Sequence, residues 1–517
     1  MQLNGAVTSS AARLLRDDLT AAGFTVGALG LLWGDAAASA LHRGQRVPAE
    51  RALAARQRAQ GRSPIATLAE LFVLGRAVAR EDAAAALRSF GVSGAVDLGL
   101  LAVEDDRVAP LLDLRPYAFV DAHGAAEWWI ASDLGELALG RQLPENHVLG
   151  VGGASTTLSG LMLQSPVSSA LDLGTGCGIQ ALHASRHADR VVATDISPRA
   201  LVLAALNAEL NGVDNIEFRL GSLFEPVAGE RFDRIVSNPP FVITPRAEGV
   251  PAYEYRDGGM VGDALVQAVV SGAGEHLTSG GTAQFLANWE YRAGSDAFDR
   301  VSGWLDSPGA AGLDAWVIER EVQDAAEYAE TWIRDGGTRS GTPEFDALYT
   351  AWLDDFAERR VDSVGFGYVL LRRPPSSEPT LRRLERLHGS LGSNEAGLGV
   401  HLGAYLEAHD WQVRVEDAVL ASSRLVAGGD VTEERHSWPG DDGPTAMLLR
   451  QGGGFGRAIQ GDTALVAFVG ACDGELTVGA IVAAIAQLLE VDQELLGDEL
   501  LPVVRALIDD GFLYPAE

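Results

Sequence analysis

A glycine-rich turn between an apolar strand and a helical pattern constrains the fold of this chain more than any other feature. The strand beginning at Ala170 runs into the turn Asp172–Gly178, and the helical pattern Ile179–Ser185 follows. This order is typical of nucleotide-binding α/β proteins, because glycine lets the backbone approach a ligand closely. A dinucleotide fingerprint needs G-x-G-x-x-G, whereas the sixth position counted from Gly174 is Ile179. A P-loop needs a lysine, and the chain contains none.

An acidic residue ends the next predicted strand. The run Arg190–Thr194 leads directly into Asp195. In a doubly wound sheet, this position faces the ligand crevice and suits an acceptor for two ribose hydroxyls. The segment Asp195–Pro198 also suits the start of the predicted helix Arg199–Leu210. We therefore expect Asp195 to bind a ribose and Ser197 to cap the helix.

Two more predicted strands follow, Ile216–Leu220 and Phe232–Ser237, and the second ends in the tetrapeptide Asn238-Pro239-Pro240-Phe241. The Asn238 side-chain oxygen and the Pro239 carbonyl suit the two N–H bonds of a planar nitrogen group, whose lone pair would then face a methyl donor. Phe241 would stack on the planar face of that group. The alternative is a strand that ends in a Pro-Pro turn with a core phenylalanine. The glycine-rich turn upstream favours the catalytic interpretation.

The stretch from about Val148 to Trp289 resembles class I S-adenosylmethionine-dependent methyltransferases. The resemblance is to the branch with an Asn-Pro-Pro-aromatic motif, which includes release-factor glutamine, adenine-N6 and ribosomal RNA guanine-N2 methyltransferases. It is carried in the family's order by Asp172–Gly178, Ala193–Pro198 and Ser237–Phe241. The resemblance implies S-adenosylmethionine as cofactor and a Rossmann-like, seven-stranded α/β core.

The resemblance also implies the site residues. The expected catalytic residues are Asn238, Pro239, Pro240 and Phe241. The expected cofactor-binding residues are Asp172, Gly174, Thr175, Gly176, Gly178, Asp195, Ile196, Ser222, Leu223 and Asn238.

Two further positions bear on this site. Many relatives carry an aspartate where this chain has Ser222, so the adenine contact expected there is weaker, although serine also accepts hydrogen bonds. Upstream, Thr157 and Leu158 align with a loop on the substrate and cofactor side of the family, and a plain glycine-rich connection is the alternative.

Composition places the chain among globular proteins. Its 517 residues, 47% of them hydrophobic, are expected to form about three domains. The sequence shows no run of eighteen apolar residues, and Met1–Asn4 does not begin a signal peptide, so we expect a soluble cytoplasmic protein. The cysteines Cys177 and Cys472 give neither a disulfide framework nor a metal-binding spacing, and no metal is expected.

The predicted domains are a mainly helical, winged-helix-like domain at 1–122, the methyltransferase domain at 123–373, and a small α+β, winged-helix-like domain at 374–517. A helical insertion is expected at about 323–362. In the last domain we expect a strand at Thr463–Val469 and helices at Val478–Leu489 and Leu500–Asp510.

The net charge of −31 bears on the kind of molecule that would accept the methyl group. Basic residues supply most of the affinity for nucleic acid, so the acidity favours a protein or small-molecule acceptor. Three hypotheses follow: an N-methyltransferase acting on a protein glutamine side chain, which is favoured; a methyltransferase acting on adenine-N6 or guanine-N2 of RNA or DNA; and a cofactor-binding module without catalysis. The first predicts a macromolecular protein partner and no membrane association.

Overall fold

The computed structural model describes residues 9–139, 143–247, 249–251, 253–375, 378–440 and 443–516. Contacts divide the chain into two compact units. The first comprises residues 1–119, 125–159 and 166–386, and the second comprises 120–124, 160–165 and 387–517. Among the described residues, no helix combines the length and the apolar character that a membrane span requires.

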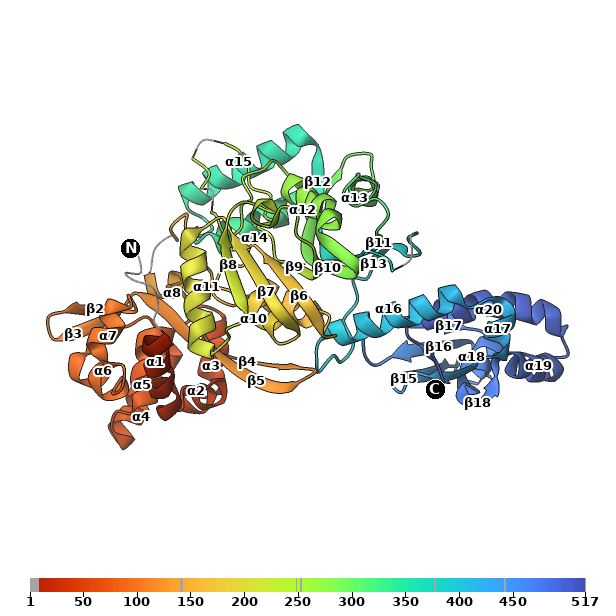
Figure 1. Cartoon of the computed structure of the whole chain (residues 1–517), viewed down its shortest axis with the longest axis horizontal. Coiled ribbons are helices and arrows are strands. Elements are labelled where there is room, and N and C mark those ends of the chain that lie inside the picture. The colour runs from red at the N-terminus through yellow and green to blue at the C-terminus, as the bar shows by residue number, and fades with distance from the viewer. Residues whose placement is uncertain are drawn as a thin grey trace. The chain divides into compact units, whose positions relative to one another are not determined.

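The first unit is built around an eight-stranded sheet in the order β13-β11-β12-β10-β9-β6-β7-β8 (Figure 1). The strands β8, β7, β6, β9 and β10 pair in parallel, and β12 runs antiparallel to both β10 and β11. The bounds are β6 Val167–Leu173, β7 Ala188–Asp195, β8 Ile216–Leu220, β9 Phe232–Ser237, β10 Leu277–Arg292, β11 Asp314–Asp324, β12 Val361–Arg372 and β13 Arg382–Arg386. The predicted strands Ile216–Leu220 and Phe232–Ser237 are confirmed.

Helical crossovers join the parallel strands, as the right-handed βαβ connection requires. The helices after β6 and β7 share one apolar core with the N-terminal helices, and the helices after β9 and β10 form a second core that includes Val266, Val269 and Val301. The helices are α9 Gly153–Leu161, α10 Ile179–Ser185, α11 Pro198–Asn211, η2 Glu225–Val227, α12 Ala264–Ala273, η3 Gly274–His276 and α13 Ala297–Leu305.

The N-terminal region is mainly helical and ends in a small sheet of order β1-β3-β2. From β1 to β3 the chain forms a strand, two helices and a hairpin. This order is compatible with the predicted winged-helix-like domain, which stays a prediction. Its elements are α1 Ser9–Ala21, α2 Val26–Trp33, α3 Asp35–His42, α4 Val47–Gln60, α5 Pro64–Leu68, the π-helical turn η1 Ala69–Val73, β1 Val78–Ala79, α6 Arg80–Ala86, α7 Gly91–Asp97, β2 Leu101–Glu104 and β3 Arg107–Pro110. A two-stranded pair, β4 Leu112–Asp121 and β5 Gly124–Asp133, and the short helix α8 Glu136–Leu139 follow.

Asn207 on α11 fixes this region against the glycine-rich turn. Its fully buried side chain donates to the carbonyls of Ala131 at 2.9 Å and Cys177 at 2.8 Å, and it accepts from the Ala131 amide at 2.7 Å. One amide thus satisfies backbone groups from β5 and from the turn, which are distant in sequence.

The predicted helical insertion is present between β11 and β12. It consists of α14 Ala325–Asp335 and α15 Pro343–Arg359. Both helices begin with side-chain caps, from Asp324 and Thr342 respectively. Their buried aromatic residues form a separate apolar cluster with Val242 and Ile243, directly after the tetrapeptide.

The second unit carries two three-stranded sheets, of orders β15-β16-β17 and β18-β14-β19. Its elements are α16 Leu398–Arg414, α17 Asp417–Ser422, β14 Arg424–Ala427, β15 Val431–His436, β16 Ala446–Gln451, β17 Ala458–Gly461, α18 Thr463–Gly470, β18 Asp473–Thr477, α19 Val478–Leu489, α20 Gln493–Asp509 and β19 Leu513–Pro515. The helix predicted at Val478–Leu489 is confirmed as α19, and the helix predicted at Leu500–Asp510 forms the second part of the longer helix α20.

Two expectations differ from the structure. The predicted strand Thr463–Val469 was wrong, because this apolar run is the buried helix α18, whose first turn is capped by Asp462 accepting from the Leu465 amide. The sheet has eight strands rather than seven, because Arg382–Arg386 pairs in parallel with β11. Glu385 accepts from the Trp316 indole N–H at 2.7 Å, and the Arg383 guanidinium lies 5.4 Å from the same ring, which accounts for a polar strand docking there.

Candidate functional site

The register of the parallel strands brings the sequence motifs into one row. Asp172 pairs with Ala193 on β7 and with Val236 on β9, so the residues that follow these strands lie side by side. Gly174 therefore lies between Asp195 and Asn238 at the carboxyl edge. Because the chain order reverses between β6 and β9, this edge is a topological switch point, where open α/β sheets bind their ligands.

The glycine-rich turn leaves bare backbone at this edge. Gly174 and Gly176 have φ angles of +75° and +56°, and a side chain added at either would meet no heavy atom within 4 Å. Gly178 differs, since with φ of +87° its Cβ would lie 2.9 Å from the Ala204 Cβ on α11. Gly178 therefore allows the turn to pack closely against α11, while Gly174 and Gly176 border open space.

Asp172 and Thr175 form a buried polar pair beneath the turn. The Thr175 hydroxyl donates to the Asp172 carboxylate at 2.5 Å, and the Asp172 side chain is fully buried. Burial raises the pKa of the Asp172 carboxyl to about 7, and the nearby charge of Asp195 adds to the shift.

Asp195 is oriented by two backbone amides. Its carboxylate accepts from the Gly176 N–H at 2.9 Å and from the Ser197 N–H at 2.8 Å. Burial raises the pKa of this carboxyl. Ser197 precedes α11 but makes no side-chain cap hydrogen bond, so the predicted capping role of its hydroxyl was wrong.

Apolar side chains border the same edge. Ile196 directly follows β7 and is 65% exposed. Leu223 has a φ of +47°, a strained conformation for a residue with a side chain, and such strain concentrates at ligand sites. Ser222 and Leu223 are both half-buried.

The tetrapeptide follows β9, where the Ser237 hydroxyl donates to the Leu173 carbonyl at 2.6 Å. The Asn238 Oδ1 atom is buried and has no hydrogen-bond partner among the described residues. An unpaired buried acceptor costs about 1–3 kcal/mol, so this atom is available to a polar group that comes from outside.

The residues after Asn238 are held by packing. Pro239 is buried and Pro240 is half-buried. The half-buried Phe241 ring lies edge-on to Trp332 at 6.1 Å and to Phe366 at 6.2 Å.

A hydrogen-bond network that the sequence did not reveal lies behind Phe241. The fully buried Asn288 on β10 donates from Nδ2 to the Phe241 carbonyl at 2.5 Å and to the Tyr328 hydroxyl at 3.0 Å. The Tyr328 hydroxyl also accepts from the Ile243 amide at 2.9 Å. The network joins the tetrapeptide to the inserted helix α14, and only the three-dimensional packing reveals the pairing of Asn288 with Tyr328.

Thr157 and Leu158 were expected in a loop, but both lie on the helix α9. Leu158 on α9 is buried and Thr157 is exposed. Gln180, in the first turn of α10, donates to the Ser155 carbonyl at 2.7 Å, so α9 lies beside the helix that follows the glycine-rich turn.

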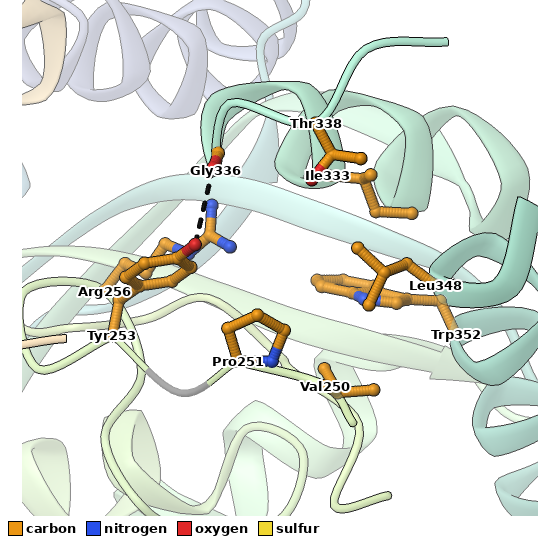
Figure 2. Close-up of a pocket in the computed structure, with 9 residues that line it drawn as sticks. All are labelled: Val250, Pro251, Tyr253, Arg256, Ile333, Gly336, Thr338, Leu348 and Trp352. Carbon is orange, nitrogen blue, oxygen red and sulfur yellow. Dashed lines mark hydrogen bonds between the residues drawn. The ribbon is translucent and has the colours of Figure 1, made fainter. Parts of the chain in front are cut away.

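A cavity under the insertion is separate from these residues. It measures about 10 Å³, which is room for about one water molecule. Tyr253 donates across one side to the Gly336 carbonyl at 3.3 Å (Figure 2). None of the predicted site residues lines the cavity. The residues that line it are Val250, Pro251, Tyr253, Arg256, Ile333, Gly336, Thr338, Leu348 and Trp352. Within the described ranges, no group of three or more His, Cys, Asp or Glu side chains could hold a metal ion.

Comparison with known proteins agrees with this arrangement. Residues 152–295 match the family model described as Methyltransferase small domain. This segment is similar to methyltransferase domains. The resemblance stated from the sequence is thereby confirmed, while the roles of individual site residues stay predictions. On either side, residues 21–111 and 403–515 match families described only as domains of unknown function.

The curated relatives match less than half of the chain. The release factor glutamine methyltransferase of Xylella fastidiosa strain Temecula1 is 39% identical over 131 residues, which are 24% of this chain and 47% of that protein. The ribosomal protein uL3 glutamine methyltransferase of Bradyrhizobium diazoefficiens is 32% identical over 194 residues, which are 35% of this chain and 59% of that protein. The chain thus spans about half the length of the curated relatives it matches.

Solved structures are less similar. A methyltransferase structure from Pyrococcus furiosus is 17% identical, with 41% of this chain and 78% of that chain covered at a TM-score of 0.25. The fold therefore rests on the strand order and register described above.

The buried Asp172 gives a pH prediction. The folded state holds its proton up to about pH 7, whereas the unfolded chain releases it near 3.8. The folded state binds more protons between these values, so the contribution of Asp172 makes the free energy of unfolding fall as pH rises. We expect Asp172→Asn to remove a fall on the order of a few kcal/mol, measured by urea unfolding at several pH values between about 4 and 8.

The exposed Asp189 on β7 provides the control, and Asp189→Asn should keep the wild-type pH dependence. An unchanged pH dependence in Asp172→Asn would contradict the assignment.

Proposed function

We propose that this protein transfers a methyl group from S-adenosylmethionine to the side-chain amide nitrogen of a glutamine in a protein partner. The observation that carries the proposal is the buried, unpaired Asn238 Oδ1 at the switch point, adjacent in register to the glycine-rich turn. An unpaired hydrogen-bond acceptor beside exposed backbone suits a reaction in which an N–H group of the substrate is brought to the methyl group of a nucleoside-like donor.

The residues of the edge fit S-adenosylmethionine. Gly174 and Gly176 leave the open backbone that such a ligand needs. The Asp195 carboxylate, already oriented by two amides, would accept from the ribose hydroxyls. Ile196 and Leu223 would flank the adenine, with Ser222 as a weaker acceptor for its amino group.

Charge supports this cofactor over a dinucleotide. S-adenosylmethionine carries positive charge on its sulfonium and amino groups, and the carboxyl groups of Asp172 and Asp195 lie at the turn. Burial raises the pKa of both carboxyls and so disfavours their ionised form, which a positively charged ligand would stabilise. A phosphate would be repelled by both carboxylates in their ionised form. When bound, the cofactor supplies an electrophilic methyl group, so the protein mainly has to orient the acceptor and exclude water.

The tetrapeptide suits the acceptor amide. Asn238 Oδ1 and the Pro239 carbonyl would accept the two amide N–H bonds, so that the nitrogen lone pair faces the methyl group. Phe241 would pack on the planar face of the amide. The contacts of Phe241 with Asn288, Trp332 and Phe366 would hold these groups in place before the substrate binds.

Two observations support a protein acceptor. The matched relatives are named as glutamine methyltransferases of a release factor and of a ribosomal protein. The net charge of −31 opposes binding to the phosphate backbone of a nucleic acid.

The cofactor site can be tested at Gly176. A Cβ there meets open space within the protein but would occupy the path of the ligand. We expect Gly176→Ala to lower the free energy of unfolding by about 1 kcal/mol, from its positive φ alone, and to weaken S-adenosylmethionine binding at least about tenfold, measured by isothermal titration calorimetry.

Gly229 is the matched control, because its φ of +81° and open surroundings are similar but it lies outside the row of motifs. Gly229→Ala should cost similar stability and leave the affinity unchanged. Equal affinity in the two variants, or no binding by the wild type, would refute the cofactor site.

The roles of Asp195 and Asn238 can be separated by kinetics. We expect Asp195→Ala to weaken S-adenosylmethionine binding, and Asn238→Ala to lower kcat by about 10² to 10³ while the cofactor Kd changes little. Transfer of a labelled methyl group into cell extract, with and without nuclease or protease, measures the activity. An equal loss of cofactor affinity in both variants would contradict this division, and label lost to nuclease but resistant to protease would refute the protein acceptor.

A further inference from the structure

The helical pair α19–α20 of the second unit presents an exposed apolar surface at its turn. Leu488 is 82% exposed, Leu495 60%, Val491 47% and Leu489 41%. We call these four residues the α19–α20 tip. Single exposed apolar residues are common, but four within eight consecutive positions form a patch of the kind that marks interaction sites.

The turn that carries the tip is well defined. Glu490 ends α19 in the left-handed conformation with φ of +56°, and its amide donates to the Ala486 carbonyl. Asp492 caps α20 by accepting from the amides of Glu494 at 2.9 Å and Leu495 at 3.0 Å. Buried Ile485 and Leu496 anchor the two helices in the core of the unit. The tip is therefore presented in a fixed arrangement rather than on a loose loop.

The sequence on either side of the tip is acidic. From residue 458 to residue 504 the sequence contains no arginine, lysine or histidine. Five exposed carboxylates lie within the turn and the first part of α20: Glu490, Asp492, Glu494, Asp498 and Glu499.

The negative charge around the α19–α20 tip restricts the kind of partner that can bind there. Nucleic acid and anionic lipid would be repelled, and so would a second copy of the same acidic surface. A segment with apolar side chains flanked by positive charges would instead bury the leucines and pair with the carboxylates.

We propose that the α19–α20 tip docks a cationic, amphipathic segment of a partner protein. The exposed leucines contribute the affinity by losing contact with water, and the carboxylates around them set orientation and speed association. The inference concerns binding alone and holds whether or not methyl transfer is confirmed.

A designed peptide tests the docking surface in the full-length protein. The probe is a fluorescently labelled helical peptide of about sixteen residues, with leucines at i, i+3 and i+7 and arginines beside them. We expect fluorescence anisotropy to show binding that weakens at higher salt. The double variant Leu488→Ser, Leu495→Ser should weaken binding at least about tenfold.

Leu31 on α2 gives a matched control, since it is 81% exposed, as Leu488 is, but lies in the other unit. Leu31→Ser should bind the peptide as the wild type does. The charge variant Glu494→Gln, Asp498→Asn should weaken binding and reduce its salt dependence without removing any apolar side chain.

Three results would overturn the proposal. In the first, the leucine double variant binds as tightly as the wild type. In the second, a peptide with serines in place of its leucines binds equally well, which means general attraction to an acidic chain. In the third, sedimentation velocity shows wild-type dimers that the double variant lacks, which makes the tip a contact between copies of this chain.

Discussion

Parallel pairing of β6 with β7 and β9 is the constraint on which the site depends. In a parallel sheet the carboxyl ends of neighbouring strands meet at one edge, so a shift in register would separate the glycine-rich turn from Asp195 and Asn238. Two contacts hold the register at that edge. The Ser237 hydroxyl donates to the Leu173 carbonyl, and the Gly174 amide donates to the Thr194 carbonyl.

Hydrogen bonds from segments distant in sequence also hold the residues at this edge of the sheet in place. Asn207 joins the turn to β5, and the network of Asn288 and Tyr328 joins the tetrapeptide to the inserted helix α14. The cluster formed by α14, α15, Val242 and Ile243 packs the insertion against the residues that follow the tetrapeptide. The small cavity beneath it is consistent with a packed support rather than a second binding site.

The sequence alone was sufficient to predict which residues meet wherever a motif lies at the end of a predicted strand. Asp172–Gly178, Asp195 and Asn238–Phe241 each lie at the carboxyl end of a strand or directly after it, so their meeting at one edge follows from the α/β pattern. Asn288 and Tyr328 could not be found in this way, because each reads as an ordinary residue of its own element and acquires its function from a partner distant in sequence.

The two errors in secondary structure have similar origins. The run Thr463–Val469 is apolar throughout, so periodicity does not separate a buried strand from a buried helix. Arg382–Arg386 is polar enough to resemble a linker, and its pairing with β11 and its contacts with Trp316 place it in the sheet.

The most direct test of the account is to identify the methylated group. Protein from an extract of cells lacking this chain would be methylated with labelled S-adenosylmethionine, purified and hydrolysed in acid. A methylated glutamine amide is cleaved to glutamate and methylamine, so the account predicts that the label is released as methylamine. Label that stays on an amino acid after hydrolysis, or that appears only in nucleosides, would contradict it.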